Sequence, residues 1–268
     1  ENIGSTENKG MELKLNAHLL YDVENDRYLS TSFSIAKNTN KLKKISNALR
    51  SYNDEVDNEI LDGNTNRPQT RFIEGSSMNA IWAVRSLDPA TGDEIFLTKD
   101  GETTTEWKAE DQVVCGDAMP ECSGTFGINM DYRGIFLNMS FYYQFGGQTY
   151  NQTLVDRVEN ANVGLNVDKR IYNAVWKKPG DRVDFSYNPY RLTKPSSRFV
   201  QDLNELRLSS LNVGYDFRHC AFLKKSRLQQ LKASFYMDDV FRASTVKTER
   251  GLTYPFARTF SFSLQATF

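Results

Sequence analysis

The segment Arg258–Phe268, RTFSFSLQATF, decides the fold class of this chain of 268 residues. Apolar and polar residues alternate along it with a period of two, which is typical of a strand with one apolar and one wetted face. Two interpretations remain open at this point: the edge strand of a soluble antiparallel sandwich, or a strand that crosses a membrane, which needs ~9–11 residues. The apolar face carries Phe260, Phe262, Leu264, Ala266 and Phe268.

The same alternation recurs in six earlier segments, so the sequence predicts seven strands. Each is roughly long enough to span a bilayer when tilted. The six earlier apolar faces extend from Met11 to Tyr21, from Leu29 to Ile35, from Phe126 to Tyr132, from Ile135 to Phe145, from Leu211 to Phe217 and from Leu231 to Met237.

Short and long connections alternate between these strands. The connections at 22–25, 133–134 and 218–227 are short, and those at about 38–124, 146–204 and 238–257 are long. Connections in compact soluble domains are mostly a few residues. Outer-membrane barrels, in contrast, have short periplasmic turns and long extracellular loops. The pattern therefore favours an all-β fold, a portion of an antiparallel transmembrane β-barrel, over a sandwich.

The distribution of charge agrees with a barrel in lipid. Glu12, Lys14 and Asp216 fall on the predicted inner face, and no charge falls on the predicted outer faces of 135–145 and 260–268. A lysine on the lipid face at mid-bilayer would cost about 2–4 kcal/mol. The net charge of −1 gives no indication of nucleic acid as a partner. No run of about 18 apolar residues is present, which excludes a membrane-spanning helix.

Seven strands cannot form a complete object of this kind. Single-chain bacterial barrels have an even number of strands and must close, because lipid tolerates no open edge. We therefore expect residues 1–268 to be the C-terminal part of a larger barrel, with earlier strands upstream of Glu1.

Seven stretches, in order along nearly the whole chain, carry a family resemblance. They are NKGMELKLNA (8–17), NKLKKISNALRSYN (40–53), SSMNAIWAVRSLDPATGDEIF (76–96), FGGQTYNQTLVDRVENA (145–161), NVDKRIYNAVWKKPGD (166–181), SSRFVQDLNELRLSSLNVGYDF (196–217) and YPFARTFSFSLQATF (254–268). Together they resemble SusC/RagA-type TonB-dependent outer-membrane transporters.

The resemblance implies a barrel of about 22 strands, of which these would be the last seven, and an N-terminal plug domain that precedes residue 1. It implies import of oligosaccharides or peptides across the outer membrane of a Gram-negative bacterium, driven through TonB. It also implies a SusD-like surface lipoprotein that closes over the barrel as a lid. The alternative function is a surface glycan-binding or adhesive β-sheet protein without transport.

The terminal strand has a second implied role. In outer-membrane barrels the last strand, with its final aromatic residue, is the segment that the barrel-assembly machinery engages before insertion into lipid. The residues expected to form this signal are Phe260, Phe262, Leu264 and Phe268.

Two groups of residues are candidates for the substrate path. One group lies on the predicted inner face near the extracellular end, where packing against other strands or the plug is the alternative role. The other group consists of tryptophans in the long loops, whose rings could stack on sugars, although two of the three are expected in loop cores. The candidates are Asn138, Tyr142, Gln144, Trp82, Trp107 and Trp176.

Neither a cofactor nor an enzymatic activity is expected. Asp88 and Asp93 in the stretch DPATGDE could hold a loop calcium ion loosely, but the stretch lacks EF-hand spacing and an ordinary polar turn is favoured. A hydrolase would need a Ser–His pair towards the outer leaflet. The only histidines, His18 and His219, fall near the predicted periplasmic end, which disfavours a hydrolase.

Two local predictions concern the start and end of the first long loop. The run from Lys41 to Leu49 has the pattern of a short amphipathic helix. Cys115 and Cys122 are close enough in sequence to close a small loop, but whether they form a disulfide stays open.

Overall fold

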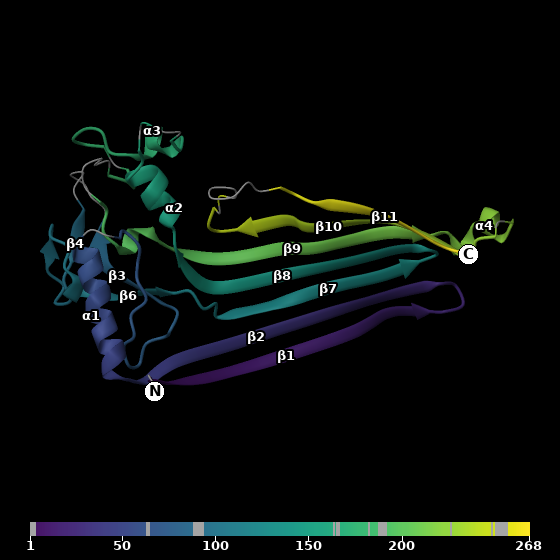
Figure 1. Cartoon of the computed structure of the whole chain (residues 1–268), viewed down its shortest axis with the longest axis horizontal. Helices are drawn as coiled ribbons and strands as arrows, with labels where there is room; N and C mark the ends of the chain where they lie inside the picture. The colour runs from purple at the N-terminus through teal and green to yellow at the C-terminus, as the bar shows by residue number, and fades with distance from the viewer. Residues whose placement is uncertain are drawn as a thin grey trace. The chain divides into compact units, whose positions relative to one another are not determined.

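A computed structural model describes residues 4–62, 65–87, 94–162, 164, 167–181, 183–186, 192–225, 227–247, 249 and 257–268 (Figure 1). The chain divides into two compact units. Unit 1 comprises residues 1–9, 39–119 and 147–202, and unit 2 comprises residues 10–38, 120–146 and 203–268.

A seven-stranded sheet dominates the fold, and its strands lie side by side in chain order (Figure 1). The strand pairs β2–β7, β7–β8, β9–β10 and β10–β11 are antiparallel. This arrangement confirms the seven predicted strands. They are β1 (Gly4–Asp22), β2 (Arg27–Ile45), β7 (Cys122–Tyr132), β8 (Ile135–Tyr150), β9 (Val200–Asp216), β10 (Gln230–Ser244) and β11 (Phe260–Thr267).

The register of the strands joins the predicted apolar faces into continuous surfaces. Directly opposite residues of an antiparallel pair share a face. Phe126 on β7 lies opposite Phe33 on β2 and opposite Phe141 on β8. Phe235 on β10 lies opposite Phe262 on β11, with ring centroids 5.1 Å apart. The apolar side chains of β2, β7 and β8 therefore lie on one face, and so do those of β10 and β11.

Much of this apolar face is exposed. Met11 on β1 is 76% exposed, and Phe262 on β11 is 77% exposed. Soluble monomers rarely expose a contiguous apolar surface of this kind, whereas lipid covers the outer face of a membrane barrel. Among the residues that the structure describes, no helix is both long and apolar enough to cross a bilayer.

The short connections are confirmed. Residues 23–26 join β1 to β2, and Arg133 and Gly134 join β7 to β8. Arg133 and Gly134 have φ angles of 52° and 92°, the left-handed values that a two-residue type I′ hairpin turn requires. The third connection holds two short helices, η4 (Phe217–His219) and α4 (Ala221–Lys225).

The strands extend further than their apolar alternation indicates. β1 begins at Gly4 rather than Gly10, β2 continues to Ile45, and β8 continues to Tyr150. The long connections are shorter by the same residues. The backbone ladder does not need apolar side chains to continue, so a strand can outlast the alternation from which it was predicted.

The amphipathic helix predicted from Lys41 is wrong. Leu42 is part of β2, and its backbone N–H donates to the Ser76 carbonyl at 2.9 Å while its carbonyl accepts from Gly75 at 2.7 Å. The helix α1 (Asn47–Leu61) begins only after Ser46, whose side-chain oxygen caps it by accepting from the backbone of Leu49. These long-range backbone partners keep residues 41–45 extended.

Unit 1 has the small elements and buried cores of a soluble fold. One core joins Ile60, Val84, Phe96 and Trp107, and the other includes Val155 and Phe199. Its four-stranded sheet has the order β5-β4-β3-β6. Besides α1, its elements are β3 (Ala80–Leu87), β4 (Ile95–Leu97), β5 (Thr103–Thr104), η1 (Ala109–Asp111), β6 (Gln112–Asp117), α2 (Gln152–Leu154), η2 (Val155–Glu159), α3 (Arg170–Ala174) and η3 (Ser197–Phe199).

Candidate substrate path

The structure places the strand candidates of the substrate path on the polar face of the sheet. Asn138 lies opposite Asn129, and Tyr142 lies opposite Thr125. Gln144 follows Tyr142 two residues later on the same face of β8. In a membrane barrel the polar face is the inner wall. The three residues therefore line the interior, although a contact with substrate stays a prediction.

A small interacting group surrounds Tyr142. Its hydroxyl donates a hydrogen bond to Oε1 of Gln144 at 2.9 Å. The guanidinium carbon of Arg207, on β9, lies 5.3 Å from the centroid of the Tyr142 ring. Sequence reasoning did not single out Arg207. Alternation along β9, counted from Leu211 and Val213, puts Arg207 on the apolar face, so no signal in the sequence indicated this contact.

The tryptophan candidates differ in exposure. Trp82 and Trp107 are each 6% exposed and belong to the interior of unit 1. Trp107 donates from Nε1 to the Pro195 carbonyl at 3.0 Å, and the Arg71 guanidinium lies 5.7 Å from the centroid of the Trp82 ring. Both rings thus lie in the loop core, where two of the three tryptophans were expected, and a substrate contact for either stays a prediction. Trp176 is only partly buried, and its role stays a prediction.

One electrostatic cluster of unit 1 is a buried arginine between two carboxylates. Arg198 donates from Nε to Glu94 at 3.0 Å and from a terminal nitrogen to Glu159 at 2.7 Å. Thr193 also donates to Glu159, at 3.2 Å. Burial raises the pKa of Glu159, although the Arg198 charge opposes this effect. The pKa of Arg198 is raised by the two carboxylates despite its burial. The paired charges hold two long connections together.

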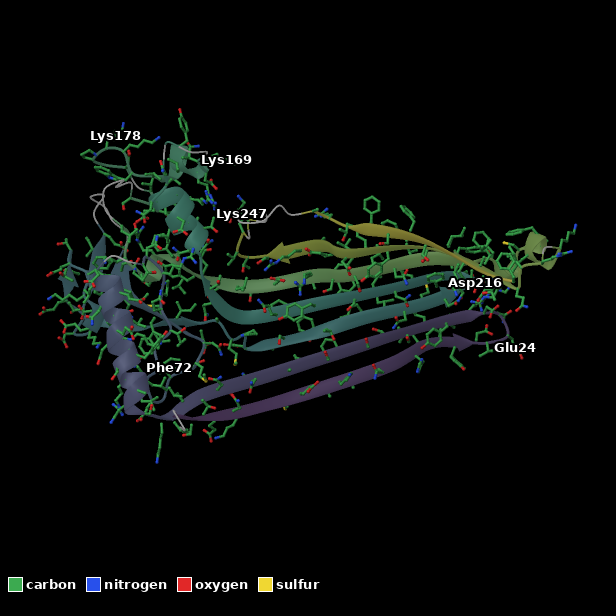
Figure 2. All side chains as sticks on the ribbon, in the orientation of Figure 1. Glu24, Phe72, Lys169, Lys178, Asp216 and Lys247 are labelled. Carbon is green, nitrogen blue, oxygen red and sulfur yellow. The ribbon has the colours of Figure 1, made fainter. Side chains whose placement is uncertain are left out.

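A second charged cluster lies at the short-turn end of the sheet, where Figure 2 labels Glu24 and Asp216. Arg218 reaches Asp131 at 3.0 Å and Asp216 at 3.4 Å. His219 pairs with Asp26, with 2.8 Å between its Nε2 and a carboxylate oxygen. The cluster ties the connection at 23–26 and the connection after β9 to the end of β7.

The two histidines do not form the pair that a hydrolase would need. His219 has Asp26 as its partner, and the His18 ring lies beside Tyr28, with centroids 5.6 Å apart. Neither arrangement is a Ser–His pair.

The metal and disulfide predictions have different outcomes. Asp88 and Asp93 lie outside the described residues, so the structure says nothing about a calcium ion there. Within the described ranges, no group of three or more His, Cys, Asp or Glu side chains is arranged to hold a metal ion. Cys115 and Cys122 are both free thiols. Burial raises the pKa of the Cys115 thiol, which donates to the Ala83 carbonyl at 3.3 Å.

Comparison with known proteins places this geometry in context. No model of a known protein family matches the chain. TonB-dependent receptor P3 of Formosa agariphila is 25% identical over 307 residues, a match that covers 100% of this chain and 29% of the relative. TonB-dependent receptor P39 of the same organism is 26% identical over 156 residues, covering 56% of this chain and 15% of the relative.

Solved structures agree with these relatives. The RagAB peptide importer in its closed-closed state superimposes with a TM-score of 0.74 at 17% identity, covering 100% of this chain and 30% of the importer chain. Another structure of the RagAB peptide transporter gives a TM-score of 0.67 at 17% identity, over 92% of this chain and 27% of that chain. The SusC/RagA-type resemblance is confirmed.

The sheet therefore has the fold of part of the RagAB importer chain. The matched proteins are named as receptors and transporters, not as enzymes. The chain spans less than a third of their length, at 29% of the receptor P3 and 30% of the importer chain.

Proposed function

We propose that this chain is the barrel segment of an outer-membrane transporter that imports oligosaccharides or peptides, driven through TonB. The observation that carries the proposal is the two-faced sheet. Its strands follow chain order, its apolar face is exposed, and its polar face carries Asn138, Tyr142 and Gln144. A lipid-covered outside and a wet inside are what a transport barrel requires. The named receptor and importer relatives support the same function.

The proposal includes an orientation and a lid. The short connections are periplasmic and the long ones extracellular, because outer-membrane barrels have this asymmetry. The long connections contribute the two buried cores of unit 1, so they form a folded surface rather than loose loops. Because such a surface is already ordered, little conformational entropy is lost when a SusD-like lipoprotein docks on it. The alternative of a soluble adhesive sheet is disfavoured by the exposed apolar face.

Uptake by cells tests the transport proposal. Cells that carry the full-length transporter with its neighbouring lipoprotein receive a fluorescently labelled peptide pool or a labelled oligosaccharide pool. Accumulation of one pool in the periplasm is expected, and loss of either the transporter or TonB is expected to abolish it. Equal accumulation in the wild-type and TonB-deficient strains would contradict the proposal.

The terminal strand supplies a second test, of barrel assembly. Phe268 directly follows β11 and is 81% exposed, so its ring is accessible to the assembly machinery. Deleting Phe268 from the full-length protein is expected to cut the heat-modifiable folded band in the outer-membrane fraction sharply. Thr267→Ala is the matched control and is expected to leave the band intact. Equal bands for the deletion and the wild type would show that the ending is an ordinary strand.

A further inference from the structure

Two arginines face the barrel interior beside Tyr142. Arg207 and Arg242 lie directly opposite each other on β9 and β10, so they share a face. The Arg207 guanidinium stacks 5.3 Å from the centroid of the Tyr142 ring, which belongs to the polar face. Both arginines therefore project inward.

The two arginines differ in how their charges are neutralised. Arg242 forms an ion pair with Glu205. Arg207 has no carboxylate partner in the part of the chain that the structure describes. Another carboxylate nearby along β10, Asp238, accepts a hydrogen bond from the hydroxyl of Tyr236. Arg207 thus lies directly opposite the like charge of Arg242, an arrangement that is destabilising.

The surrounding polar groups add donors rather than acceptors. Oε1 of Gln144 is occupied by the Tyr142 hydroxyl, which leaves the amide nitrogen as a donor. The Nε atoms of Arg207 and Arg242 are buried, and neither has a hydrogen-bond partner among the described residues. An excess of unpaired donors around a positive charge matches an anion. The planar fork of arginine suits a carboxylate, and stacking on an aromatic ring holds that plane in place.

We propose that Arg207, stacked on Tyr142 and assisted by the amide of Gln144, is a subsite for a carboxylate of the imported substrate. The inference rests on the proposed transport function and deepens it, because it selects substrates that carry a carboxylate. That group is either the C-terminus of a peptide or the uronate of an acidic oligosaccharide. The two sources share the same planar oxyanion, so the subsite binds both in the same way.

Binding to the purified full-length transporter in detergent tests the subsite. Equilibrium dialysis is carried out with two matched pairs of probes. One pair is a hexapeptide pool without acidic residues, with a free or an amidated C-terminus. The other pair is an oligogalacturonate pool and its methyl ester. The wild type is expected to bind one carboxylate probe about tenfold more tightly than its neutral counterpart, as a charge-assisted contact provides. The pair that shows the preference identifies the source.

Variants separate the subsite from general effects on the barrel. Arg207→Gln is expected to abolish the preference, and Arg207→Lys to keep part of it because the charge remains without the fork. Gln144→Met, which leaves the arginine in place, is expected to reduce the preference about threefold by removing one donor. Arg133→Gln, at the exposed hairpin turn beside Tyr132, is the matched control and is expected to leave the preference unchanged. Each variant is checked for the heat-modifiable folded band.

The outcomes are distinguishable from those of the uptake test. An unchanged preference in folded Arg207→Gln would overturn the subsite, and so would a wild type that prefers neither carboxylate probe. If Arg207→Gln does not fold, an unchanged preference in both Arg207→Lys and Gln144→Met would overturn it as well. TonB-dependent uptake without any carboxylate preference would remove the subsite and leave the transport proposal standing. A carboxylate preference without TonB-dependent uptake would remove the transport proposal and leave the subsite standing.

Discussion

Unit 1 and the long-stranded sheet use the same apolar residue types in opposite ways. Phe199 in unit 1 is 0% exposed and packs among other buried side chains, whereas Phe262 on β11 is 77% exposed. In water, burial stabilises by about 25 cal/mol per Å² of apolar surface. Unit 1 obtains this stabilisation from its own cores. The sheet does not, and its apolar face is stable only where lipid replaces water. One part of the chain is therefore stabilised by burial from water, and the other by contact with lipid.

Removal of a ring from each region should show the contrast most clearly. Phe199→Ala opens a cavity in the core that also contains Leu154 and Val155, at an expected cost of about 3–5 kcal/mol. Phe262→Ala removes the same ring from the lipid-facing surface, where no cavity opens inside the protein, so the folded barrel is expected to lose much less protease resistance than it does with Phe199→Ala. Limited proteolysis of the full-length protein against temperature measures both. Equal protease resistance in the two variants would contradict the contrast.

The buried charges of unit 1 provide the next test. Arg198→Met leaves Glu94 and Glu159 buried without their counter-charge, which is expected to destabilise unit 1 by about 3–5 kcal/mol at pH 8. Burial raises the pKa of Glu159 in the folded state above its unfolded value. The folded state then binds more protons than the unfolded state, so stability falls as pH rises through this interval.

The variant should accordingly recover part of its stability at pH 5. Protease resistance at the two pH values measures this recovery, with Arg67→Met as the control, because the Arg67–Asp156 pair is far more exposed and lies at 3.6 Å. A loss for Arg198→Met that is independent of pH would show that the buried carboxylates are not its cause.

The two faces of β8 can be separated by one pair of substitutions. Phe141→Lys puts a charge on the apolar face opposite Phe126, and in lipid this is expected to cost about 2–4 kcal/mol. Ser140→Lys puts the same charge on the polar face opposite Gly127, where there is no side chain to displace. The heat-modifiable folded band should fall for Phe141→Lys and persist for Ser140→Lys. The reverse order would mean that the faces have been assigned the wrong way round.

The smallest expected effect is that of Tyr143→Phe, because Tyr143 is a buried residue on the otherwise largely exposed apolar face. Tyr143 is only 9% exposed, and its hydroxyl crosses Gly124 to donate to the Ser34 carbonyl at 2.7 Å. Tyr143→Phe keeps the ring and removes one hydrogen bond, for about 0.5–1.5 kcal/mol. The temperature at which the folded band is lost should fall slightly, and Tyr132→Phe at the hairpin should leave it unchanged. If Tyr143→Phe loses the folded band at the same temperature as the wild type, the hydrogen bond to Ser34 does not contribute to the stability of the sheet.

The hairpin of β7 and β8 was predictable because all its information is local. Alternation identifies both faces, and the two-residue turn Arg133-Gly134 sets the register that places Met130 opposite Leu137. The full length of β2 was not predictable, because its last residues are polar and its partners near Ser76 are distant in sequence. The position of Arg207 is a similar case. The count of faces along β9 from Val213 puts Arg207 on the apolar face, whereas its contact with Tyr142 puts it on the polar face.

The sequence by itself determined the number of strands, their faces and the alternation of short and long connections. These features follow from a period of two and from turn chemistry, which neighbouring residues carry. Only the tertiary structure decided that Trp82 and Trp107 are core residues, and that Arg198 joins Glu94 to Glu159. The physical reason is that burial and ion pairing depend on segments far apart in the chain, and such contacts leave no local period in the sequence.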